Sequence, residues 1–586
     1  MKRLIISVLM VVLAVVAMHA AKAYSMPVTV TQPDGTQVTV VLHGDEYINW
    51  ITTDDGVLVV KKDKAYYVAE IADDNSLKAT TLLAHKPQQR TAAEQTAISR
   101  QERSQFLTHA SNTMRKAAAR YIPVSTSSHY FPHKGTPTAI VILVQFEDQK
   151  FTVEDPVASF NYYLNGIDFS PKNNGEDKLQ ESVADYFDGC SFGQFRPQFE
   201  VHGPVTIDQP ISYFKKTNNS QDLVKTACRL ADDEVNFKDP KYDSDGDGRV
   251  DAVCMLFAGH SGSILGNDDY PWPHAWTTSL TLDGAMIYRY NLINELAGNV
   301  GNTNINGIGL FCHEFSHVMG LPDLYPTDEN YASNQAMEFW SLMDAGEYLI
   351  NGNAPTAYTA WEREAMGWME IETLDETLHI GQLASIDEGG KAYRIMNTAQ
   401  TNNLEYLMLE NIQQTKLNAK QKGHGLLVYH VNYAKNVVAD GDEPNNDPGK
   451  PRMTVVPADG FLMVMGMTED PVGSGKYTYN AYYNQLAGDP FPGTTAKTSL
   501  SDTDTLPNYA PWVGDKWNRS LDNIVEANGV IDFDFISHNE TAIAVVKSNN
   551  SADAMFYTID GRLAGNDKSQ LPAGLYITGG RKVAIK

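Results

Sequence analysis

The chain has 586 residues, a formal net charge of −26 at pH 7 and a sequence pI of about 4.9. Acidity of this degree argues against nucleic acid or an anionic lipid surface as a partner, because their phosphates would repel the protein. It suits a secreted protein that must stay dispersed.

The first residues have the pattern of a signal peptide. Lys2 and Arg3 precede an apolar run over residues 4–17, and Ala21-Lys22-Ala23 is a small-x-small cleavage site. The run is shorter than the roughly 20 apolar residues that a transmembrane helix needs, and no later segment reaches 18 uninterrupted apolar residues. We therefore expect residues 1–23 to be removed, leaving a secreted chain that begins at Tyr24 and has no transmembrane segment.

The next hundred residues form a separate N-terminal region. Residues 27–71 alternate apolar and polar side chains between turn signals, which predicts a small β-rich module. Residues 72–122 are rich in alanine, glutamine and basic residues and show no strong core pattern. Residues 24–125 are interpreted as a propeptide and linker, the alternative being an ordinary N-terminal domain. Candidate processing sites are Arg100, Arg103, Arg115 and Arg120.

Residues 126–370 alternate strand and helix patterns. Apolar runs at residues 139–146 and 250–257 predict buried strands, residues 178–187 and 221–235 predict helices, and a further helix is expected from about Ile305. This alternation indicates a domain of mixed α/β class.

An acidic loop precedes the second of these strands. Positions 1, 3, 5 and 9 of a calcium-binding loop are occupied by Asp243, Asp245, Asp247 and Asp251. Gly248 stands at position 6, and the Arg249 carbonyl stands at position 7. Position 12 departs from the pattern, because Cys254 stands where a bidentate glutamate is usual. The loop predicts a structural calcium ion, the alternative being a solvated acidic turn.

The segment His313-Glu314-Phe315-Ser316-His317 carries the clearest chemical signal of the chain. Two imidazoles four residues apart lie on one face of a helix and can hold one metal ion, and the adjacent carboxylate can take a proton from water. Gly320 ends the helix, and Asp323 follows as a third, oxygen ligand stiffened by Pro322. Three protein ligands leave one open position, which is the catalytic zinc arrangement.

The helical periodicity of the same segment separates the ligands from an apolar stripe. At about 100° per residue, the stripe consists of Ile308, Cys312, Phe315 and Met319. His313 and His317 lie nearly opposite it. The helix is therefore expected to bury the stripe and to turn both histidines toward a cleft.

These residues resemble the metzincin zinc motif in its aspartate variant, His-Glu-x-x-His-x-x-Gly-x-x-Asp. Metzincins also carry a methionine turn beneath the zinc, and residues 340–344 fit that turn with Met343 as its methionine. The resemblance implies a metzincin-like catalytic domain.

Further stretches resemble the immune inhibitor A family of secreted bacterial metallopeptidases, over about residues 136–535: residues 182–195, 272–276, 320–325 and 423–427. The resemblance implies that His313, His317 and Asp323 bind zinc. It also implies that Glu314 is the general base and later the proton donor, and that the N-terminal region is a propeptide. Tyr348 takes the place of an oxyanion-stabilising tyrosine, although its spacing from Met343 is not the usual one.

Beyond Trp368 short strands between turn residues predict a β-rich domain over residues 371–540. Residues 541–586 are expected to form a small β-sandwich-like tail. Within it, residues 556–562 and 571–577 resemble the C-terminal sorting domain of the type IX secretion system of Bacteroidota. The tail implies the type IX machinery as a partner, the alternative being a β-sandwich cap without an address function.

The four cysteines permit disulfides without requiring them: Cys190, Cys228, Cys254 and Cys312. Cys312 lies on the apolar stripe and is expected in the core. Residues 24–123 hold no cysteine, which excludes a cysteine switch. Residues 259–263 are similar to a serine-hydrolase elbow but lack its second glycine, so they are expected to be a loop. His274 is expected to be packed in the interior rather than to line the substrate site.

The sequence thus predicts a zinc endopeptidase that works outside the cell or on its outer surface, cleaving proteins or peptides through a zinc-bound water activated by Glu314. Two alternatives stay open. One is a surface-binding or adhesive protein with a vestigial zinc site, and the other is a zinc hydrolase of non-peptide bonds.

Overall fold

The computed structural model describes residues 19–20, 23–44, 48–72, 74–103, 106–107, 130–166, 181–215, 219–264, 266–267, 269–327, 336–399, 404–433, 444–446, 449–461, 484–538, 555–559, 561–578 and 581–585. Nearly all of the expected signal peptide, Arg115, Arg120 and the start of the expected tail lie outside these residues. The chain divides into two compact units, Met1–Ile536 and Ser537–Lys586.

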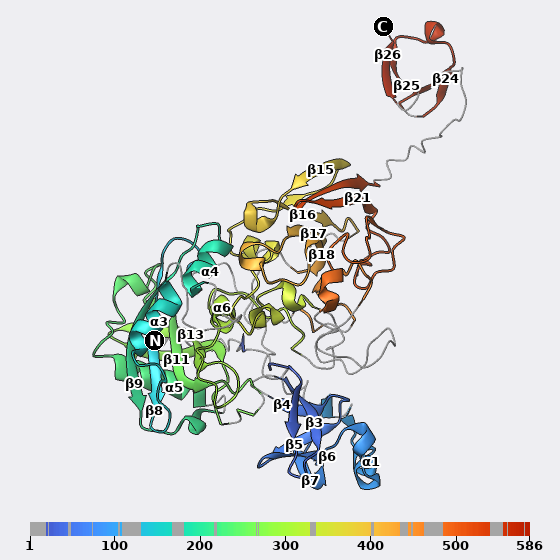
Figure 1. Ribbon diagram of the computed structural model, residues 1–586. Helices are drawn as coiled ribbons and strands as arrows, with labels where there is room; N and C mark the ends of the chain where they lie inside the picture. The colour runs from blue at the N-terminus through green and yellow to red at the C-terminus, as the bar shows by residue number, and fades with distance from the viewer. Residues whose placement is uncertain are drawn as a thin grey trace, which may run out of the picture. The chain divides into compact units, whose positions relative to one another are not determined.

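A mostly parallel sheet organises residues 130–320 (Figure 1). Its order is β1-β12-β13-β11-β8-β9, with β10 paired to β13, and only the β12–β13 and β1–β12 pairs are antiparallel. The bounds are β1 (His19–Ala20), β8 (Thr138–Phe146), β9 (Gln198–Ile207), β10 (Arg249–Val250), β11 (Val253–His260), β12 (His274–Leu282) and β13 (Ala285–Leu296).

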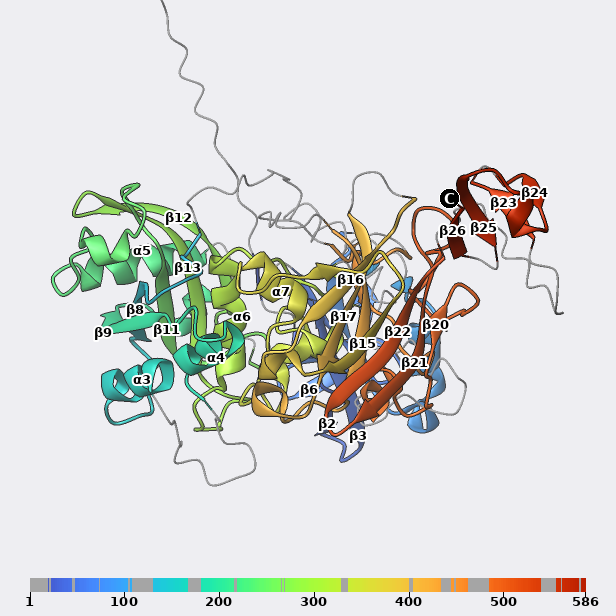
Figure 2. The same cartoon turned by 90° about the horizontal axis from the view of Figure 1, so that it is seen from above.

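Helices cover both faces of this sheet, which explains why β8 is a continuous apolar run. Ala139, Val141 and Leu143 pack with α3, α4 and α6, whereas Ile140 and Ile142 pack with α5. Figure 2 shows α5 on one side of the sheet and α3 and α4 on the other. The bounds are α3 (Pro156–Asn165), α4 (Val183–Cys190), α5 (Ser220–Ala231) and α6 (Ile308–Val318). The mixed α/β class is thereby confirmed.

The expected elements of this part are present with shifted ends. α4 begins at Val183 because the Ser182 hydroxyl accepts a hydrogen bond from the Asp185 amide at 3.2 Å. α6 begins at Ile308, three residues later than expected, because Ile305 still pairs with Leu296 in a β-bridge and Gly307 is extended.

The N-terminal region contains a six-stranded antiparallel meander in the order β2-β3-β4-β5-β6-β7. The last strand and a helix fall within the stretch for which no core pattern was expected, so the folded module extends beyond residue 71. The bounds are β2 (Val28–Thr31), β3 (Gln37–Gly44), β4 (Asn49–Thr53), β5 (Leu58–Lys62), β6 (Ala65–Ile71), β7 (Leu77–Leu83) and α1 (Ala92–Ile98).

Two further sheets follow the short helix α7 (Ala360–Ala365). One has the order β14-β16-β17-β18-β19 and the other β15-β22-β21-β20. The bounds are β14 (Glu372–Thr373), β15 (Leu378–Leu383), β16 (Ala392–Met396), β17 (Glu405–Ile412), β18 (Gly425–Asn432), β19 (Met453–Val455), β20 (Leu500–Ser501), β21 (Arg519–Ala527) and β22 (Val530–Ser537).

Strand β17 belongs to two hydrophobic cores. Tyr406 and Met408 pack into the core that also holds α6, whereas Leu407 and Leu409 pack toward the outer sheet of β15, β21 and β22. Alternate residues of one strand thus join the α/β part to the β-rich part, and no packing boundary separates them near residue 370.

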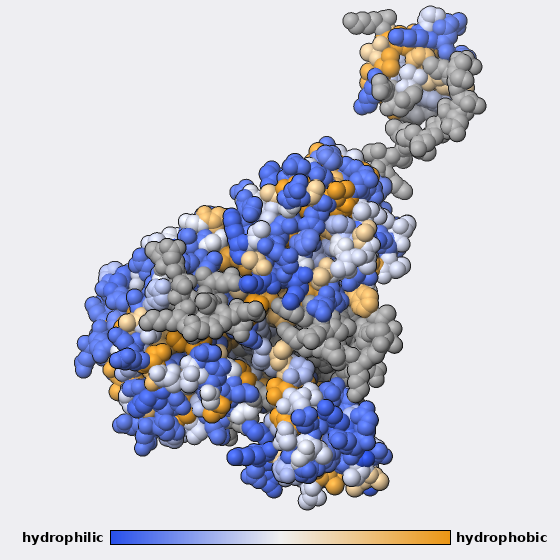
Figure 3. Space-filling view, in the orientation of Figure 1, coloured by the Kyte–Doolittle hydropathy of each residue, from blue (hydrophilic) through white to orange (hydrophobic). Residues whose placement is uncertain are grey.

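The second unit is a four-stranded antiparallel sheet in the order β24-β23-β25-β26. Its bounds are β23 (Phe556–Thr558), β24 (Leu563–Gly565), β25 (Gly574–Thr578) and β26 (Arg581–Ile585). Figure 3 shows apolar side chains at its surface, and the exposed ones include Met555, Tyr557, Ile559, Leu563 and Leu575. Within the described ranges, no helix is both long and apolar enough to cross a membrane.

Candidate metal centre

The three residues expected to bind zinc lie together. The Asp323 Oδ1 atom is 3.2 Å from the Nε2 atoms of both His313 and His317, and the two Nε2 atoms are 3.1 Å apart. Ligand atoms at 2.0–2.1 Å from one tetrahedral ion are separated by about 3.4 Å. The three side chains are buried, with exposed fractions of 0%, 2% and 5% for His313, His317 and Asp323. Their spacing and chemistry fit a zinc ion.

Both imidazoles are oriented through their second nitrogen. The Nδ1–H group of His313 donates to the Leu342 carbonyl at 2.9 Å, and that of His317 donates to the Leu321 carbonyl at 2.7 Å. Because Nδ1 carries a proton, the neutral form of each ring has its lone pair on Nε2, the atom that faces Asp323. This is the tautomer that a metal ligand requires.

Residues 340–344, which were expected to form a methionine turn, accept two hydrogen bonds from the site. The carbonyl of Leu342 receives the His313 hydrogen bond, and the carbonyl of Met343 accepts the Leu324 amide at 2.7 Å. Met343 itself is fully buried in the core that holds α6. Consecutive carbonyls of the turn therefore hold the first histidine and the residue that follows Asp323.

Gly320 ends the ligand helix as the sequence predicts. Its φ of 103° is left-handed, the Gly320 amide donates to the His317 carbonyl at 2.9 Å, and the Leu321 amide donates to the Ser316 carbonyl at 3.0 Å. This pair of bonds is the Schellman motif. It reverses the chain so that Asp323 returns to the histidines.

The ligand helix is more deeply buried than the sequence indicates. Ile308, Cys312, Phe315 and Met319 lie in the core as expected, but His313 and Glu314 are also 0% exposed. The expected open cleft face is covered by the segment after the methionine turn, since the Gly309 amide donates to the Gly352 carbonyl at 2.9 Å.

Carboxylates surround the first histidine. Burial alone would lower the pKa of His313, but Glu347, Asp323 and Glu314 outweigh it and raise that pKa to about 10. Glu347 Oε2 lies 3.9 Å from His313 Nδ1, and burial, opposed by His313, raises the pKa of Glu347 to about 8. A buried group of this composition stabilises positive charge between its members.

Tyr348 interacts electrostatically with both Glu347 and Glu314. Burial, together with the negative charges of Glu347 and Glu314, raises the pKa of Tyr348 well above its usual range. The phenol therefore stays protonated near neutral pH and can donate a hydrogen bond.

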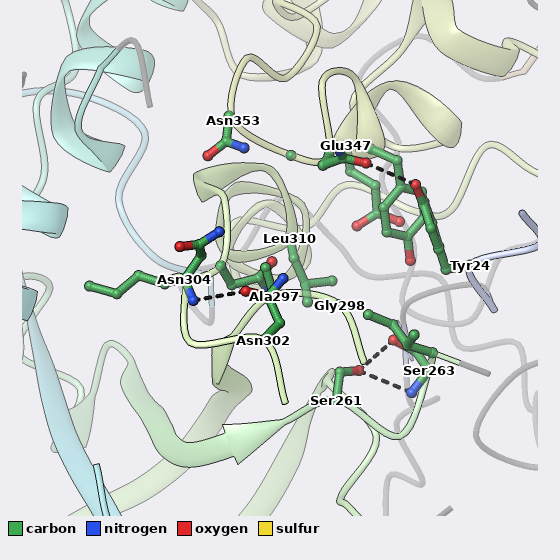
Figure 4. Close-up of a pocket in the computed structure, with 16 residues that line it drawn as sticks. Tyr24, Ser261, Ser263, Ala297, Gly298, Asn302, Asn304, Leu310, Glu347 and Asn353 are labelled. Atoms are coloured by element: carbon green, nitrogen blue, oxygen red, sulfur yellow. Dashed lines mark hydrogen bonds between the residues drawn. The ribbon is translucent and has the colours of Figure 1, made fainter. Parts of the chain in front are cut away.

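A cavity of about 430 Å³ adjoins these residues (Figure 4). Its lining includes Leu310 of α6, Glu347 and Tyr348, and the loop with Ser261 and Ser263. The stretch expected to be a loop is one only from Ser261 onward, because Gly259 and His260 are the last residues of β11. The hydroxyls of Ser261 and Ser263 bond to each other at 2.5 Å.

The acidic loop gathers three of its four aspartates. Asp243, Asp245 and Asp251 place carboxylate oxygens within 4.8 Å of one another, whereas Asp247 lies 3.5 Å from the Arg249 guanidinium. Burial, reinforced by Asp245 and Asp243, raises the pKa of Asp251 to about 6. Backbone amides of residues 247 and 248 donate to Asp243 at 3.0 Å.

The remaining sequence predictions concern packed residues. The four cysteines are buried and free, so they form no disulfide, and Cys312 is a core residue. His274 is also packed, because its nitrogens contact the Trp272 carbonyl at 2.8 Å and the Tyr290 hydroxyl at 3.0 Å. Burial lowers the pKa of His274 to about 4.

Sequence reasoning missed Glu347 and Tyr24. Glu347 precedes Tyr348, but nothing in its local pattern distinguishes it from a solvated acid. Tyr24 is 289 positions before His313 and reaches the site only through tertiary structure. Within the sequence, only the proximity of Glu347 to the methionine turn could have indicated its place.

The comparisons with known proteins concern the part of the chain that holds this site. Residues 132–369 match the family model of the immune inhibitor A peptidase M6 catalytic domain. The pre-pro-metalloprotease PrtV of Vibrio cholerae is 24% identical over 285 residues, which cover 39% of this chain and 30% of the relative. Immune inhibitor A of Bacillus thuringiensis is 24% identical over 270 residues, with 38% and 39% covered.

The chain therefore spans only about a third of the length of these relatives. The matched segment nevertheless contains the His313–His317–Asp323 group, Glu314, the methionine turn and the acidic loop. This segment is similar to the catalytic domain of the immune inhibitor A peptidases of family M6, and the comparisons support a metallopeptidase.

Proposed function

We propose that the chain is a secreted zinc-dependent endopeptidase that hydrolyses peptide bonds of extracellular proteins. The observation that carries the proposal is the buried triangle of His313 Nε2, His317 Nε2 and Asp323 Oδ1, with edges of 3.1–3.2 Å, beside Glu314 on the same helix. His313, His317 and Asp323 would hold the ion. When bound, zinc supplies a Lewis acid that polarises the scissile carbonyl and acidifies water.

Glu314 would be the general base and acid. Its carboxylate accepts a proton from the attacking water and later returns that proton to the leaving amine. The full burial of Glu314 excludes bulk water, which strengthens its interactions with the reacting groups. The protonated Tyr348 hydroxyl, close to Glu314, would donate a hydrogen bond to the oxyanion that develops on the substrate.

Casein hydrolysis by the purified protein, with and without a zinc chelator and beside Glu314→Gln, tests this function. We expect chelator-sensitive cleavage that the variant lacks, because the amide cannot accept the proton. Loss of activity by about 10²-fold or more is the size expected for a general base. Absence of cleavage by zinc-loaded, processed protein would favour the adhesive alternative, and metal-dependent hydrolysis of esters alone would favour the non-peptide hydrolase.

The secretion route and the role of the tail form a second part of the proposal. The signal-peptide pattern of residues 1–23 supports export, and the separate compact unit of residues 537–586 supports a sorting domain for type IX secretion. The N-terminal module would be a propeptide, which agrees with the description of the Vibrio relative as a pre-pro-protein.

We also propose that the acidic loop binds a structural calcium ion through Asp243, Asp245 and Asp251. The three carboxylates repel one another at this spacing until a cation neutralises them. Calcium at about 100 times its dissociation constant should stabilise the protein by about 2.7 kcal/mol. Asp245→Asn should lose most of the shift in melting temperature, whereas Asp233→Asn, an exposed residue outside the loop, should keep it. An equal shift in both variants would contradict the site.

A further inference from the structure

One side chain of the N-terminal region forms part of the wall of the cavity beside the proposed metal centre. Its lining includes Tyr24 together with Leu310, Tyr348 and Asn351 of the catalytic part. Figure 4 shows the Tyr24 side chain reaching the cavity next to Glu347. Tyr24 is the first residue expected to remain after removal of the signal peptide, and it precedes the first strand of the N-terminal sheet.

Tyr24 is held through its ring, its hydroxyl and its backbone. The ring centroids of Tyr24 and Tyr348 are 4.9 Å apart at an interplanar angle of 60°. The Tyr24 hydroxyl donates to Asn351 Oδ1 at 3.1 Å, and its amide donates to the Ser263 carbonyl at 3.0 Å. A side chain held in a pocket while its backbone bonds to the rim is the manner in which extended peptides are recognised.

Residues 19–20, which belong to the segment expected to be removed as a signal peptide, also pair as an extended peptide would. Strand β1 adds antiparallel to β12, with His19 opposite Ala275 and Ala20 opposite His274. Without β1, β12 would be the outermost strand of the sheet. Helix α6 contacts both strands, so the added strand runs beside the helix that carries the metal ligands.

The cavity adjoins the groups that would perform catalysis. Tyr348, which contacts the Tyr24 ring, interacts electrostatically with Glu314, and Glu347 of the same cavity lies 3.9 Å from His313. A substrate side chain in this cavity would therefore belong to a residue close to the cleaved bond. Tyr24 already makes the contacts with Tyr348 and Asn351 that such a side chain would use.

We propose that Tyr348 and Asn351, at the edge of the cavity, form a side-chain subsite of the peptidase that selects tyrosine, and that Tyr24 occupies this subsite in the unprocessed chain as a pseudosubstrate. This inference rests on the proposed peptidase function. Tyr348 provides the aromatic contact and Asn351 accepts a hydrogen bond from the phenol of the occupant. The same contacts that hold Tyr24 would make tyrosine the preferred residue at this position of a substrate.

The preference for tyrosine over phenylalanine should be moderate. Asn351 is exposed, so water partly replaces the phenol when phenylalanine is bound. One hydrogen bond of this kind corresponds to a preference of about threefold to tenfold. Alanine, which loses the ring contact as well, should be discriminated against more strongly.

Peptide binding to the metal-free full-length protein tests the subsite without relying on catalysis. The probes are three blocked hexapeptides that are identical except for one central tyrosine, phenylalanine or alanine. We expect Tyr24→Ala to bind the tyrosine peptide at least tenfold more tightly than the unaltered chain does. Tyr67→Ala, a half-buried tyrosine of the same N-terminal sheet that does not line the cavity, should bind like the unaltered chain.

Two further variants test separately how the ring and the hydroxyl of tyrosine contribute to binding. Tyr24→Phe should still block binding, and Asn351→Ala in the Tyr24→Ala protein should equalise the tyrosine and phenylalanine peptides. Equal binding by the unaltered chain and Tyr24→Ala, or no preference among the three peptides, would overturn the proposal. Casein hydrolysis by the same proteins distinguishes failure of the subsite proposal from failure of the peptidase proposal. If only the subsite proposal is wrong, casein is still cleaved; if only the peptidase proposal is wrong, the peptides still bind as expected.

Discussion

Glu314 and His317 lie three residues apart on α6, yet their replacement should have different consequences. His317 contributes an Nε2 atom to the ligand triangle, whereas Glu314 is not part of the triangle. The two positions therefore separate metal binding from proton transfer, which activity measurements alone cannot do.

We expect His317→Ala to lose both zinc and turnover, and Glu314→Gln to lose turnover while retaining about one zinc per chain. The amide of glutamine keeps the shape of Glu314 but cannot accept a proton. Metal content after gel filtration, measured by atomic emission, checks both variants. Stoichiometric zinc in His317→Ala would remove that residue from the ligand set.

Gly309 shows how closely α6 approaches the segment after the methionine turn. A Cβ atom at this position would lie 1.9 Å from the Glu347 carbonyl oxygen. Overpacking of this kind costs about 1–3 kcal/mol, which outweighs the gain in helix propensity of about 1 kcal/mol.

Gly309→Ala is therefore expected to lower the free energy of unfolding and to displace Glu347 and Tyr348. Gly189→Ala is the matched control, because Gly189 is also helical and its Cβ would meet only the end of the Leu417 side chain at 3.1 Å. Thermal melting of both variants checks the comparison. Equal melting temperatures would show that the two segments can move apart at little cost.

At the scale of elements, His85 joins two parts of the N-terminal module. Its Nε2 lies 2.8 Å from Asp34 after β2, and its Nδ1 lies 2.8 Å from Glu94 in α1. Burial lowers the pKa of His85, but the hydrogen bonds and charges of Asp34 and Glu94 outweigh it and raise the pKa above 6.5. Only the doubly protonated imidazolium can donate to both carboxylates at once.

The stabilisation from His85 should accordingly depend on pH. Because the pKa is raised in the folded state, the contribution is complete below pH 6.5 and disappears as pH rises through the folded-state pKa. Hydrogen exchange of the α1 amides in the unaltered chain and in His85→Gln, compared at each pH, measures it. A difference that stays constant from pH 5.5 to about pH 9 would contradict the ionic role.

At the same scale the sequence was informative about single elements. The strand at residues 139–146, the helix around the histidines and its end at Gly320 were predictable, because each depends on local periodicity or on one backbone conformation. The N-terminal strand β7 was missed, since its apolar residues are only partly buried and produce no clear alternation.

For the whole molecule, the division at residue 537 predicts independent folding of the tail. Removal of residues 539–586 should leave the melting temperature and the casein hydrolysis of the first unit unchanged, because these residues belong to a separate compact unit. Differential scanning calorimetry of the shortened chain checks this. A lower melting temperature would mean that the tail stabilises the first unit.

Truncation of the chain near residue 370 should, in contrast, lower the melting temperature of the part that remains. β17 and β18 contribute Tyr406, Met408 and Tyr429 to the core that contains α6, so the α/β part would lose one wall of its own core. We therefore expect the α/β part alone to be less stable than the whole first unit, which thermal melting of the shortened chain would measure.

The sequence alone predicted the group of His313, His317 and Asp323, which the structure brings together, because these residues stand at short, fixed spacings along one helix and the loop after it. It also predicted the α/β class, from the alternation of strand and helix patterns. Tertiary structure alone decided the rest. It brought Tyr24 and Glu347 to the cavity, buried His313 and Glu314, and joined the β-rich sheets to the core that contains α6. Such contacts link residues far apart in the chain, and local periodicity carries no information about which distant surfaces pack together.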